Sequence, residues 1–372
     1  MTTKKRYIEL LCPARDYRAA IAAIDCGADA LYIGAEGFGA RRAATNATED
    51  IARVVDYAHL YGVRVYVTLN TILYEGELQR AEKLARELIA VGVDALIVQD
   101  MAYYMMDLPI PLHASTQMSV HTPSGVRALH EMGFKRVVLS REMSRDEIKE
   151  CAKIPIELEV FVHGALCMSV SGQCYFSAML GSRSGNRGAC AQTCRLPFEP
   201  TGDGKPRPCS ADKAALSLKD NCLIDYVQDL AAMGVRSLKI EGRMKRPEYV
   251  AAATAVYAGA VRGEIPSPAD LERLKSVFSR TGFTDGYYTD KRGGGMFGIR
   301  RHEDVTAAAP VLKELARTYD KEVPRVGIAL ALTIDETESR LALTDEDGHT
   351  VTVCGEGGDV SCIKVRHKIG PL

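Results

Sequence analysis

Eight short apolar segments alternate with helical patterns over about the first 260 residues of this 372-residue chain. The strand-like segments are Ile8–Cys12, Ala30–Gly34, Arg64–Asn70, Ala95–Asp100, Leu112–Ser115, Arg136–Glu142, Glu157–Gly164 and Ser237–Glu241. Strands that alternate with helices indicate parallel βα units. About 250 residues suffice to close eight such units into a barrel. We therefore predict an α/β fold, a (β/α)8 TIM-like barrel, over residues 6–262.

The helical patterns between these strands support the same fold. They cover Asp16–Cys26, Glu49–Tyr61, Glu77–Val91, Ser124–Met132, Ser144–Ala152, Ile224–Met233 and Pro247–Arg262. Glycine follows five of them, as is common where a helix ends. An open doubly wound sheet is the alternative, but it usually carries a glycine-rich phosphate-binding turn after its first strand. Here that turn reads Cys12-Pro13-Ala14-Arg15, which favours the barrel.

The chain divides into three predicted parts. Residues 1–262 form the barrel, with a cysteine-rich insertion at 165–216 after its seventh strand. Residues 263–322 form a helical and glycine-rich connection, and residues 323–372 a small β module whose abrupt end leaves truncation open. The strands expected in the module are Arg325–Leu332, Arg340–Thr344, Thr350–Cys354 and Cys362–Arg366. Its two thiols, Cys354 and Cys362, are predicted to lie in its core.

Composition limits the possible surroundings and partners. The formal net charge is −1, so a contact with RNA must come from local basic patches. No apolar run reaches the roughly 18 residues of a membrane span, and the N-terminus does not resemble a signal peptide. We therefore expect a cytoplasmic protein, in which eleven cysteines suggest ligands and buried thiols rather than disulfides. The thiols expected in or near the core are Cys12, Cys26, Cys151 and Cys222.

Four cysteines follow the seventh predicted strand on a glycine-rich loop. They are Cys167, Cys174, Cys190 and Cys194, separated by six, fifteen and three residues. Thiolates bind soft metals, and four of them suit zinc or an iron–sulfur cluster. The two close C-x-x-C pairs usual in zinc ribbons are missing here, which favours the cluster. Buried inert thiols are the remaining alternative.

The two faces of the strands differ in chemistry. One parity is aliphatic and should face the helices, whereas the other is polar and should face the barrel interior. The interior set is Glu9, Tyr32, Tyr66, Thr68, Asn70, Gln99, His113, Ser115, Glu159, His163, Lys239 and Glu241. Active sites of such barrels lie at the C-terminal ends of the strands, so we predict a polar catalytic mouth there. The alternative is that these buried polar groups only satisfy one another.

Nine residues are the candidates for catalysis at this mouth. They are Glu9, Asn70, His113, Arg141, Glu142, Glu159, His163, Lys239 and Glu241. We expect five of them, Glu9, His113, His163, Lys239 and Glu241, to point inward at one end of the barrel. Glu159 and His163 are the acid–base candidates, since histidine can titrate near neutral pH.

Motifs of common hydrolases are missing from the sequence. There is no H-E-x-x-H, no G-x-S-x-G and no G-x-x-x-x-G-K-[ST]. This argues against common zinc proteases, serine hydrolases and phosphate-binding-loop enzymes. A Cys–His pair made by Cys167 and His163 is the one arrangement that would suit a peptidase.

The chain resembles the collagenase-like peptidase family U-32. The resemblance rests on the blocks ELLCPA (9–14), YIG (32–34), HASTQ (113–117), EVFVHGALC (159–167), SGQC (171–174), NRGACAQTCR (186–195), SLKD (217–220) and KIEGR (239–243). It covers about residues 6–262, and its form is closest to the branch that hydroxylates ribosomal RNA. The resemblance implies a [4Fe–4S] cluster held by four cysteines of the loop. Some family members recruit a later cysteine, so Cys209 is an alternative to the favoured Cys194.

The resemblance also implies a function. Relatives support hydroxylation of a tRNA uridine, a ribosomal RNA cytidine or a ubiquinone precursor, in some cases linked to prephenate. We therefore predict an iron–sulfur enzyme that hydroxylates an rRNA or tRNA pyrimidine, with a prephenate-derived cosubstrate and an electron-transfer partner. A peptidase, as the family name implies, and a non-catalytic assembly subunit are the alternatives. The predicted phosphate contacts, unless they form an ordinary solvated face, are Arg183, Arg187, Arg195, Arg243, Lys245 and Arg246.

Overall fold

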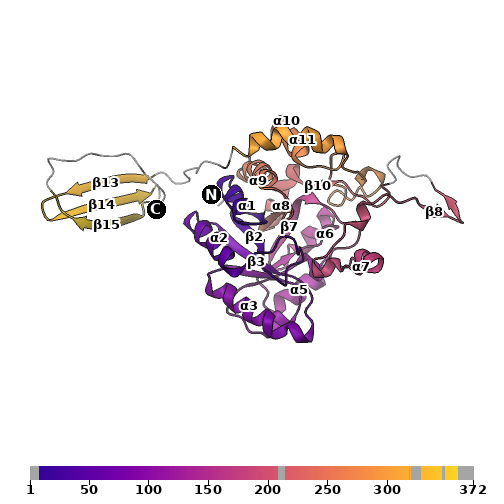
Figure 1. Cartoon of the computed structure of the whole chain (residues 1–372), viewed down its shortest axis with the longest axis horizontal. Coiled ribbons are helices and arrows are strands. Elements are labelled where there is room, and N and C mark those ends of the chain that lie inside the picture. Colours follow the sequence, from indigo (N-terminus) through magenta and orange to yellow (C-terminus); the bar gives the residue numbers. More distant parts are fainter. Residues whose placement is uncertain (1–7, 208–213, 318, 320–327, 346–347, 359–372) are drawn as a thin grey trace. The chain divides into compact units, whose positions relative to one another are not determined.

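The structure is a computed structural model that describes residues 8–207, 214–317, 319, 328–345 and 348–358. The chain forms two compact units, Met1–Lys321 and Glu322–Leu372. The first contains all the elements discussed below except one small sheet (Figure 1). None of the helices in the described ranges is both long and apolar enough to cross a membrane.

Eight parallel strands close into a barrel in the first unit. They are β1 (Glu9–Ala14), β2 (Ala30–Gly34), β3 (Arg64–Leu69), β4 (Ala95–Val98), β5 (Leu112–Ala114), β6 (Arg136–Val138), β7 (Glu157–Ala165) and β11 (Ser237–Ile240). Each pairs with its neighbour in chain order, and β11 pairs with both β7 and β1. This confirms the predicted barrel and excludes the open sheet. Each strand begins within one residue of its predicted start.

The helices surround the barrel between these strands. They are α1 (Tyr17–Asp25), α2 (Thr48–Leu60), α3 (Leu78–Ala90), α4 (Ala102–Met105), α5 (Pro123–Glu131), α6 (Arg145–Cys151), α8 (Val227–Met233) and α9 (Pro247–Arg262). Local sequence sets their ends. The Asp16 side chain caps α1 by accepting from Ala19 N, and Ser144 with Glu147 forms a capping box at α6. All seven predicted helices are present, whereas the short α4 was not predicted.

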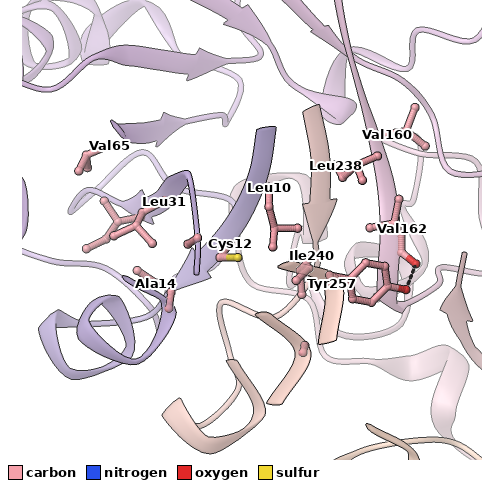
Figure 2. Packing of buried hydrophobic residues seen from close by; sticks show 14 of the residues in the cluster. Leu10, Cys12, Ala14, Leu31, Val65, Val160, Val162, Leu238, Ile240 and Tyr257 are labelled. Atoms are coloured by element: carbon pink, nitrogen blue, oxygen red, sulfur yellow. Dashed lines mark hydrogen bonds between the residues drawn. The ribbon is translucent and has the colours of Figure 1, made fainter. Parts of the chain in front are cut away.

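The main hydrophobic core lies between the barrel wall and these helices. The aliphatic parity of the strands packs outward, as predicted, and Leu10, Leu31 and Leu238 are fully buried there. Figure 2 shows this layer, in which the Tyr257 hydroxyl of α9 donates to Val162 O at 2.8 Å. Burial of each such aliphatic side chain contributes roughly 1.5–3 kcal/mol. The wall of the barrel is therefore a well-packed support for the polar groups inside it.

The sheet is extended at the C-terminal end of β7. Strand β10 (Asp220–Cys222) pairs antiparallel with that end, and β12 (Phe283–Thr284) pairs with β10. The cysteine-rich segment between β7 and β10 contains α7 (Phe176–Gly181), short 3-10 turns and the hairpin β8 (Thr201–Gly202) with β9 (Lys205–Pro206). The helices α10 (Pro268–Val277) and α11 (His302–Leu315) follow the barrel. The sequence analysis did not predict the β10–β12 extension.

The second unit contains one antiparallel three-stranded sheet. Its strands are β13 (Ile328–Ile334), β14 (Glu338–Asp345) and β15 (Thr350–Glu356). The predicted strand Cys362–Arg366, with Cys362, lies outside the described residues. Cys354 is exposed, so its predicted core position is wrong. The reason is that neither face of β15 is covered by the described residues, since its apolar residues Val351 and Val353 are exposed as well.

The remaining described thiols outside the cysteine loop agree with prediction. Cys12 and Cys151 are buried, and Cys26 and Cys222 are partly buried against the core. Burial raises the pKa of Cys151 to about 11, so this thiol stays protonated at neutral pH.

Candidate functional site

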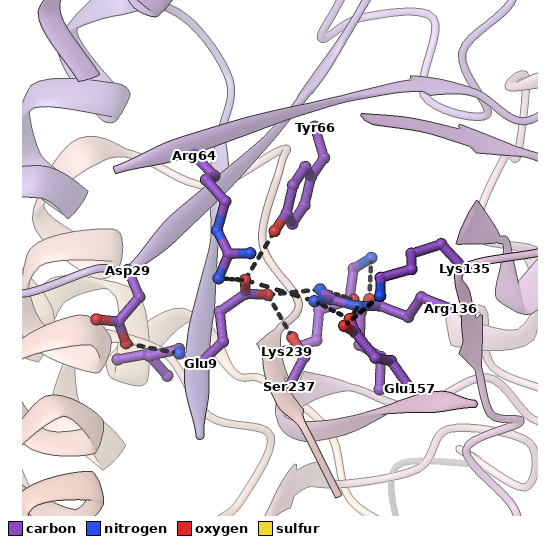
Figure 3. Close-up of polar contacts among 11 residues, drawn as sticks. Glu9, Asp29, Arg64, Tyr66, Lys135, Arg136, Glu157, Ser237 and Lys239 are labelled. Carbon is purple, nitrogen blue, oxygen red and sulfur yellow. Dashed lines mark hydrogen bonds and ion pairs between the residues drawn. The ribbon is translucent and has the colours of Figure 1, made fainter. Parts of the chain in front are cut away.

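Glu9 lies at the N-terminal end of the barrel interior. It is the first residue of β1 and pairs in register with Ser237, the first residue of β11. Its carboxylate accepts hydrogen bonds from Arg136 at 2.5 Å, Tyr66 at 2.7 Å and Ser237 at 2.9 Å, and Arg64 lies 2.7 Å away (Figure 3). The prediction that Glu9 lines the mouth is therefore wrong, because a residue that begins a strand lies at the opposite end from the mouth.

Arg136 joins Glu9 to two further carboxylates. It donates to Glu157 at 2.8 Å and to Glu159 at 3.3 Å, and Lys239 donates to Glu159 at 2.7 Å. Glu159 is fully buried, and burial lowers the pKa of Lys239 although Glu159 opposes that shift. We call this set the base network: Glu9, Arg64, Tyr66, Arg136, Glu157, Glu159, Ser237 and Lys239. Its acids and bases bind one another, as the alternative interpretation of the polar interior proposed.

His113 belongs to the same end of the barrel. It pairs in register with Arg136, and its ring meets the Tyr66 ring edge-on with the centroids 4.8 Å apart. Burial, followed by Arg136 and Lys239, holds the pKa of His113 well below its usual value. The imidazole is therefore neutral, and it lies beside the base network instead of the mouth.

His163 packs toward α9 and β12. The register shifts in β11 between Lys239 and Ile240, so that Ile240 pairs with His163. The imidazole centroid lies 5.4 Å from the ring of Tyr257 and 5.3 Å from that of Phe283. Burial, together with Lys245, lowers the pKa of His163 to about 3. With this pKa the ring is neutral near pH 7 and only weakly basic, and the acid–base role of His163 stays a prediction.

The mouth is built around Glu241, the residue that follows β11. Its carboxylate accepts from Arg141 at 2.6 Å and lies 3.8 Å from the Arg41 guanidinium. Burial opposes ionisation of Glu241, but Arg41, Arg141 and Arg243 outweigh it and lower the pKa of the carboxyl. Arg41, which lies on the loop between β2 and α2, was not among the predicted site residues. One carboxylate here faces three guanidinium groups.

Arg141 connects this mouth to the cysteine loop. Its guanidinium lies over the Phe161 ring at 4.1 Å, and its Nη1 lies 3.8 Å from Cys167 Sγ. Its Nε is buried and has no hydrogen-bond partner among the described residues. The next residue, Glu142, accepts from both the backbone N–H (2.6 Å) and the hydroxyl (2.9 Å) of Ser171. The segment after β6 thus holds the mouth and the cysteine loop together.

Asn70 and Arg243 position the remaining side of the mouth. The Asn70 carbonyl accepts from Ala40 N at 3.0 Å, which fixes the loop that carries Arg41. Arg243 is only 4% exposed and donates to Thr68 Oγ1. Burial, and then Arg41, lowers the pKa of Arg243 to about 10. Asn70 therefore acts on the mouth through the backbone of a neighbouring loop.

The four cysteines of the loop share one neighbourhood. Cys167 and Cys190 are exposed, and Cys174 and Cys194 are half-buried. Burial raises the pKa of Cys194, Arg195 opposes this, and the other three thiols add to the rise. Gln192 N donates to Cys190 Sγ at 3.3 Å.

The four thiols match the donor set of a four-iron cluster in number and kind. In the described part of the chain, no group of three or more His, Cys, Asp or Glu side chains is placed to hold one ion. In a four-iron cluster each iron takes its own thiolate, so four neighbouring sulfurs with N–H donors are a fitting donor set. Cys209, the alternative fourth ligand, lies outside the described residues.

The cysteine loop docks on the loop that carries Arg41. Arg42 N donates to Gly188 O at 3.1 Å. Gly188 has φ +80°, and a Cβ at this position would lie 2.6 Å from Gly39 O. Only glycine accepts both the left-handed backbone and this close approach. The contact places Arg41 near Cys167 and Cys190, and with Glu241 these thiols raise the pKa of Arg41 against the effect of burial.

Four of the predicted phosphate-binding residues make internal contacts, and one of them is Arg183, whose Nε donates to Ala189 O at 3.2 Å. Arg187 forms a two-pronged pair with Glu77 at 2.6 and 2.8 Å, and Arg195 donates to Ser217 Oγ at 3.0 Å and Leu218 O at 2.7 Å. Arg243 is buried, as described above. A single sequence does not reveal which arginines are already engaged in this way. Arg183 and Arg246 are exposed, and for these and Lys245 a contact with phosphate stays a prediction.

Comparison with known proteins places the chain in a family. A family model described as Peptidase family U32 matches residues 15–296. The chain belongs to peptidase family U32. This confirms the resemblance seen in the sequence blocks. The match spans the barrel from α1 onward, the cysteine loop and the β10–β12 extension.

Curated members of this family have two kinds of name. The chain is 47% identical over 281 residues to the 23S rRNA 5-hydroxycytidine C2501 synthase of Escherichia coli, covering 74% of this chain and 42% of that protein. It is 36% identical over 299 residues to tRNA hydroxylation protein P1 of Bacillus subtilis (75% and 71% covered). It is 33% identical over 312 residues to a protein named collagenase from Porphyromonas gingivalis (77% and 74% covered). The chain thus spans less than half the length of the Escherichia coli relative.

Proposed function

We propose that this chain supports hydroxylation of a pyrimidine base in rRNA or tRNA. The names of two relatives, one acting on 23S rRNA and one on tRNA, support this proposal. The observation that carries it is the place of Arg141, which contacts Glu241 of the mouth and Cys167 of the loop. A redox centre on the loop would therefore lie directly beside the polar, partly buried mouth, whose charged groups suit a pyrimidine base and a small cosubstrate.

We propose that Cys167, Cys174, Cys190 and Cys194 hold a [4Fe–4S] cluster. Such a cluster, when bound, supplies one-electron transfer at a potential set by the hydrogen bonds to its sulfurs. Among the described residues, Arg141, the Ser177 hydroxyl and the Gln192 N–H are placed to donate to sulfur atoms of this set. Cys167 and Cys190 are exposed, so an electron-transfer partner can reach this side of the loop.

The excess of cations at the mouth supports a cosubstrate that carries carboxylates. Arg41, Arg141 and Arg243 surround one carboxylate, that of Glu241. Guanidinium groups bind carboxylates with two parallel hydrogen bonds, and Arg141 Nε has no partner in the described residues. A prephenate-derived acid is the cosubstrate we propose for this place. The arginines hold this cosubstrate beside the pyrimidine of the RNA, and the mouth, with its low dielectric constant, excludes water.

The peptidase alternative receives less support from the geometry. A thiol nucleophile needs a base within hydrogen-bond reach. His163 contacts the rings of Tyr257 and Phe283, and Cys167 lies beside the cation of Arg141. The collagenase name of one relative remains the argument for proteolysis. We therefore treat peptidase activity and a non-catalytic assembly role as outcomes of the experiment below.

The test compares nucleosides from cells with and without the gene by mass spectrometry. We expect a hydroxylated pyrimidine that disappears on deletion and returns with the wild type but not with Cys167→Ala. Cys354→Ala, an exposed thiol of the other unit, is the matched control and should restore the modification. Anaerobically purified Cys167→Ala protein should also lose iron and visible absorbance. Unchanged RNA, combined with gelatin cleavage that requires Cys167, would instead establish a peptidase, and unchanged RNA without cleavage would favour the assembly role.

A further inference from the structure

Three cations surround the ring of Phe278 beside the mouth. The Lys245 ammonium lies 2.7 Å from the ring centroid, and the guanidinium carbons of Arg300 and Arg280 lie at 4.2 and 5.1 Å. The three residues come from separate segments: the loop after β11, the segment between α10 and β12, and the residues before α11. Attraction to one aromatic ring contributes about 0.5–2 kcal/mol per cation. Mutual repulsion of three like charges opposes this attraction.

The carboxylates near Lys245, Arg280 and Arg300 do not balance the positive charge of these residues. Arg280 donates to Asp220, and Asp304 acts electrostatically on Arg300. Asp220 is itself buried, which raises its pKa even though Arg280, Lys245 and Arg195 act to lower it. Glu241 also acts on Lys245, but it already faces the three arginines of the mouth. Lys245, Arg280, Arg300 and Arg195 thus share Asp220, Asp304 and part of the charge of Glu241.

Two of these cations have free hydrogen-bond donors. Within the described ranges, neither the Lys245 ammonium nor the Arg300 guanidinium forms a side-chain hydrogen bond or an ion pair within 4 Å. Both side chains are half-buried and therefore reachable from solvent. Burial, and then Arg280, lowers the pKa of Lys245 to about 7. A bound anion would reduce the repulsion among these cations by supplying negative charge.

The position of the cluster relates it to the cysteine loop. Asp220 pairs in register with Ala165, the last residue of β7 and two residues before Cys167. Arg195, next to Cys194, bridges Leu166 O and Leu218 O at the root of the loop. Lys245, Arg280 and Arg300 therefore lie on the sheet extension next to the mouth. If a pyrimidine of an RNA strand enters the mouth, the backbone of that strand would pass over these cations.

We propose that Lys245, Arg280 and Arg300 form a binding site for a phosphate of the RNA backbone. This inference rests on the proposed function and deepens it, because it names where the substrate is held outside the mouth. An RNA phosphodiester fits better than a small enclosed ligand, since Lys245 and Arg300 lie at a half-open rim in front of the buried Arg280 and the three cations come from three segments. Phosphate contacts of this kind position a nucleic acid without reading its sequence.

The test measures binding of a fluorescent twelve-nucleotide oligocytidylate by anisotropy at several KCl concentrations. Each phosphate-neutralising cation contributes about 0.7 to the slope of log affinity against log salt for single-stranded RNA. Arg300→Ala and Lys245→Ala should each lower the slope by about that amount and weaken binding several-fold at low salt. Arg292→Ala, an exposed arginine that pairs with Asp290, is the matched control and should bind like the wild type. Circular dichroism melts confirm that each variant is folded.

The outcomes separate this inference from the proposed function. If Arg300→Ala and Lys245→Ala keep the wild-type slope and affinity, the phosphate site is wrong, whatever the nucleoside analysis shows. If both lose slope while deletion of the gene leaves RNA nucleosides unchanged, the phosphate site stands and the hydroxylation proposal falls. An equal loss in Arg292→Ala would overturn the site in favour of a diffuse charge effect. Should Lys245→Ala unfold, Lys245→Arg replaces it and should keep the wild-type slope.

Discussion

The two ends of the barrel both bury charged side chains, but they balance them differently. At the base, Arg136 is held between Glu9, Glu157 and Glu159 by short ion pairs. At the mouth, the three guanidinium groups of Arg41, Arg141 and Arg243 share the single carboxylate of Glu241. The base is a closed network whose members satisfy one another. At the mouth, guanidinium groups outnumber carboxylates. This excess of positive charge distinguishes a binding site from a structural support.

Removal of Arg136 gives the largest expected effect on stability. Arg136→Ala removes the buried cation that Glu9 and Glu159 share, which should destabilise the fold by about 3–5 kcal/mol. Urea unfolding followed by circular dichroism measures the change. Arg64→Ala is the control, because the Arg64 side chain is 46% exposed and its pair with Glu9 is screened. A loss of less than about 1 kcal/mol in Arg136→Ala would show that the base is not a structural network.

Removal of Arg41 should have the opposite profile. Its side chain is 30% exposed and lies 3.8 Å from Glu241, so Arg41→Ala should change stability by about 1 kcal/mol or less. We expect cellular hydroxylation to fall at least tenfold, because a cation at the mouth is lost where the cosubstrate would bind. Urea unfolding and nucleoside mass spectrometry give the two values. Full hydroxylation in Arg41→Ala would remove the mouth arginines from the proposed mechanism.

A third prediction concerns the effect of pH on the cations around Phe278. The pKa of Lys245 is about 7, lowered by burial and then by Arg280 and Arg300, while Asp220 and Glu241 act to raise it. Phosphate binds the protonated ammonium, so oligocytidylate affinity should fall severalfold as the pH rises from 6 to 8.5. Anisotropy titrations at constant salt measure this. Lys245→Arg should flatten the profile because guanidinium stays protonated, and an unchanged profile in that variant would assign the titration to another group.

The smallest expected effect concerns the link between the two parts of the site. Glu142→Gln keeps an acceptor oxygen but removes the charge from the pair of hydrogen bonds that Ser171 donates, each of which contributes about 1.5–3 kcal/mol when the acceptor is charged. We expect global stability to be little changed. In metal-free protein, Cys167 should react with iodoacetamide faster than in the wild type, as quantified by peptide mass spectrometry. Equal rates in both proteins would mean that Glu142 does not hold the loop.

The sequence predicted the strand faces well but the ends of the barrel poorly. Alternation in β3 and β7 identified which side chains point inward, since period two is a direct property of an extended chain. It did not give the height of each residue along the barrel. Glu9 is the first residue of its strand, and Glu241 comes directly after the end of another strand. These positions along the strands, taken alone, would have assigned Glu9 to the base of the barrel and Glu241 to its mouth.

Other residues carried no usable signal in the sequence. His163 is displaced by a register shift that depends on the pairing of β7 with β11. Arg41, Arg280 and Arg300 lie in irregular segments without periodicity, and only tertiary contacts bring them to the mouth or to Phe278. Similarly, the engagement of Arg187 by Glu77 joins positions 110 residues apart.

The close approach of Gly188 to Gly39 has a consequence for protein engineering. Because the cysteine loop fits only against a matching backbone at residues 39–42, the two segments form one transferable part although they lie far apart in the sequence. A chimaera that takes the loop from one relative and the barrel from another should assemble only when both segments come from the same parent. Anyone who grafts this loop onto a new barrel therefore needs to move two pieces of chain, and the shorter one carries Arg41.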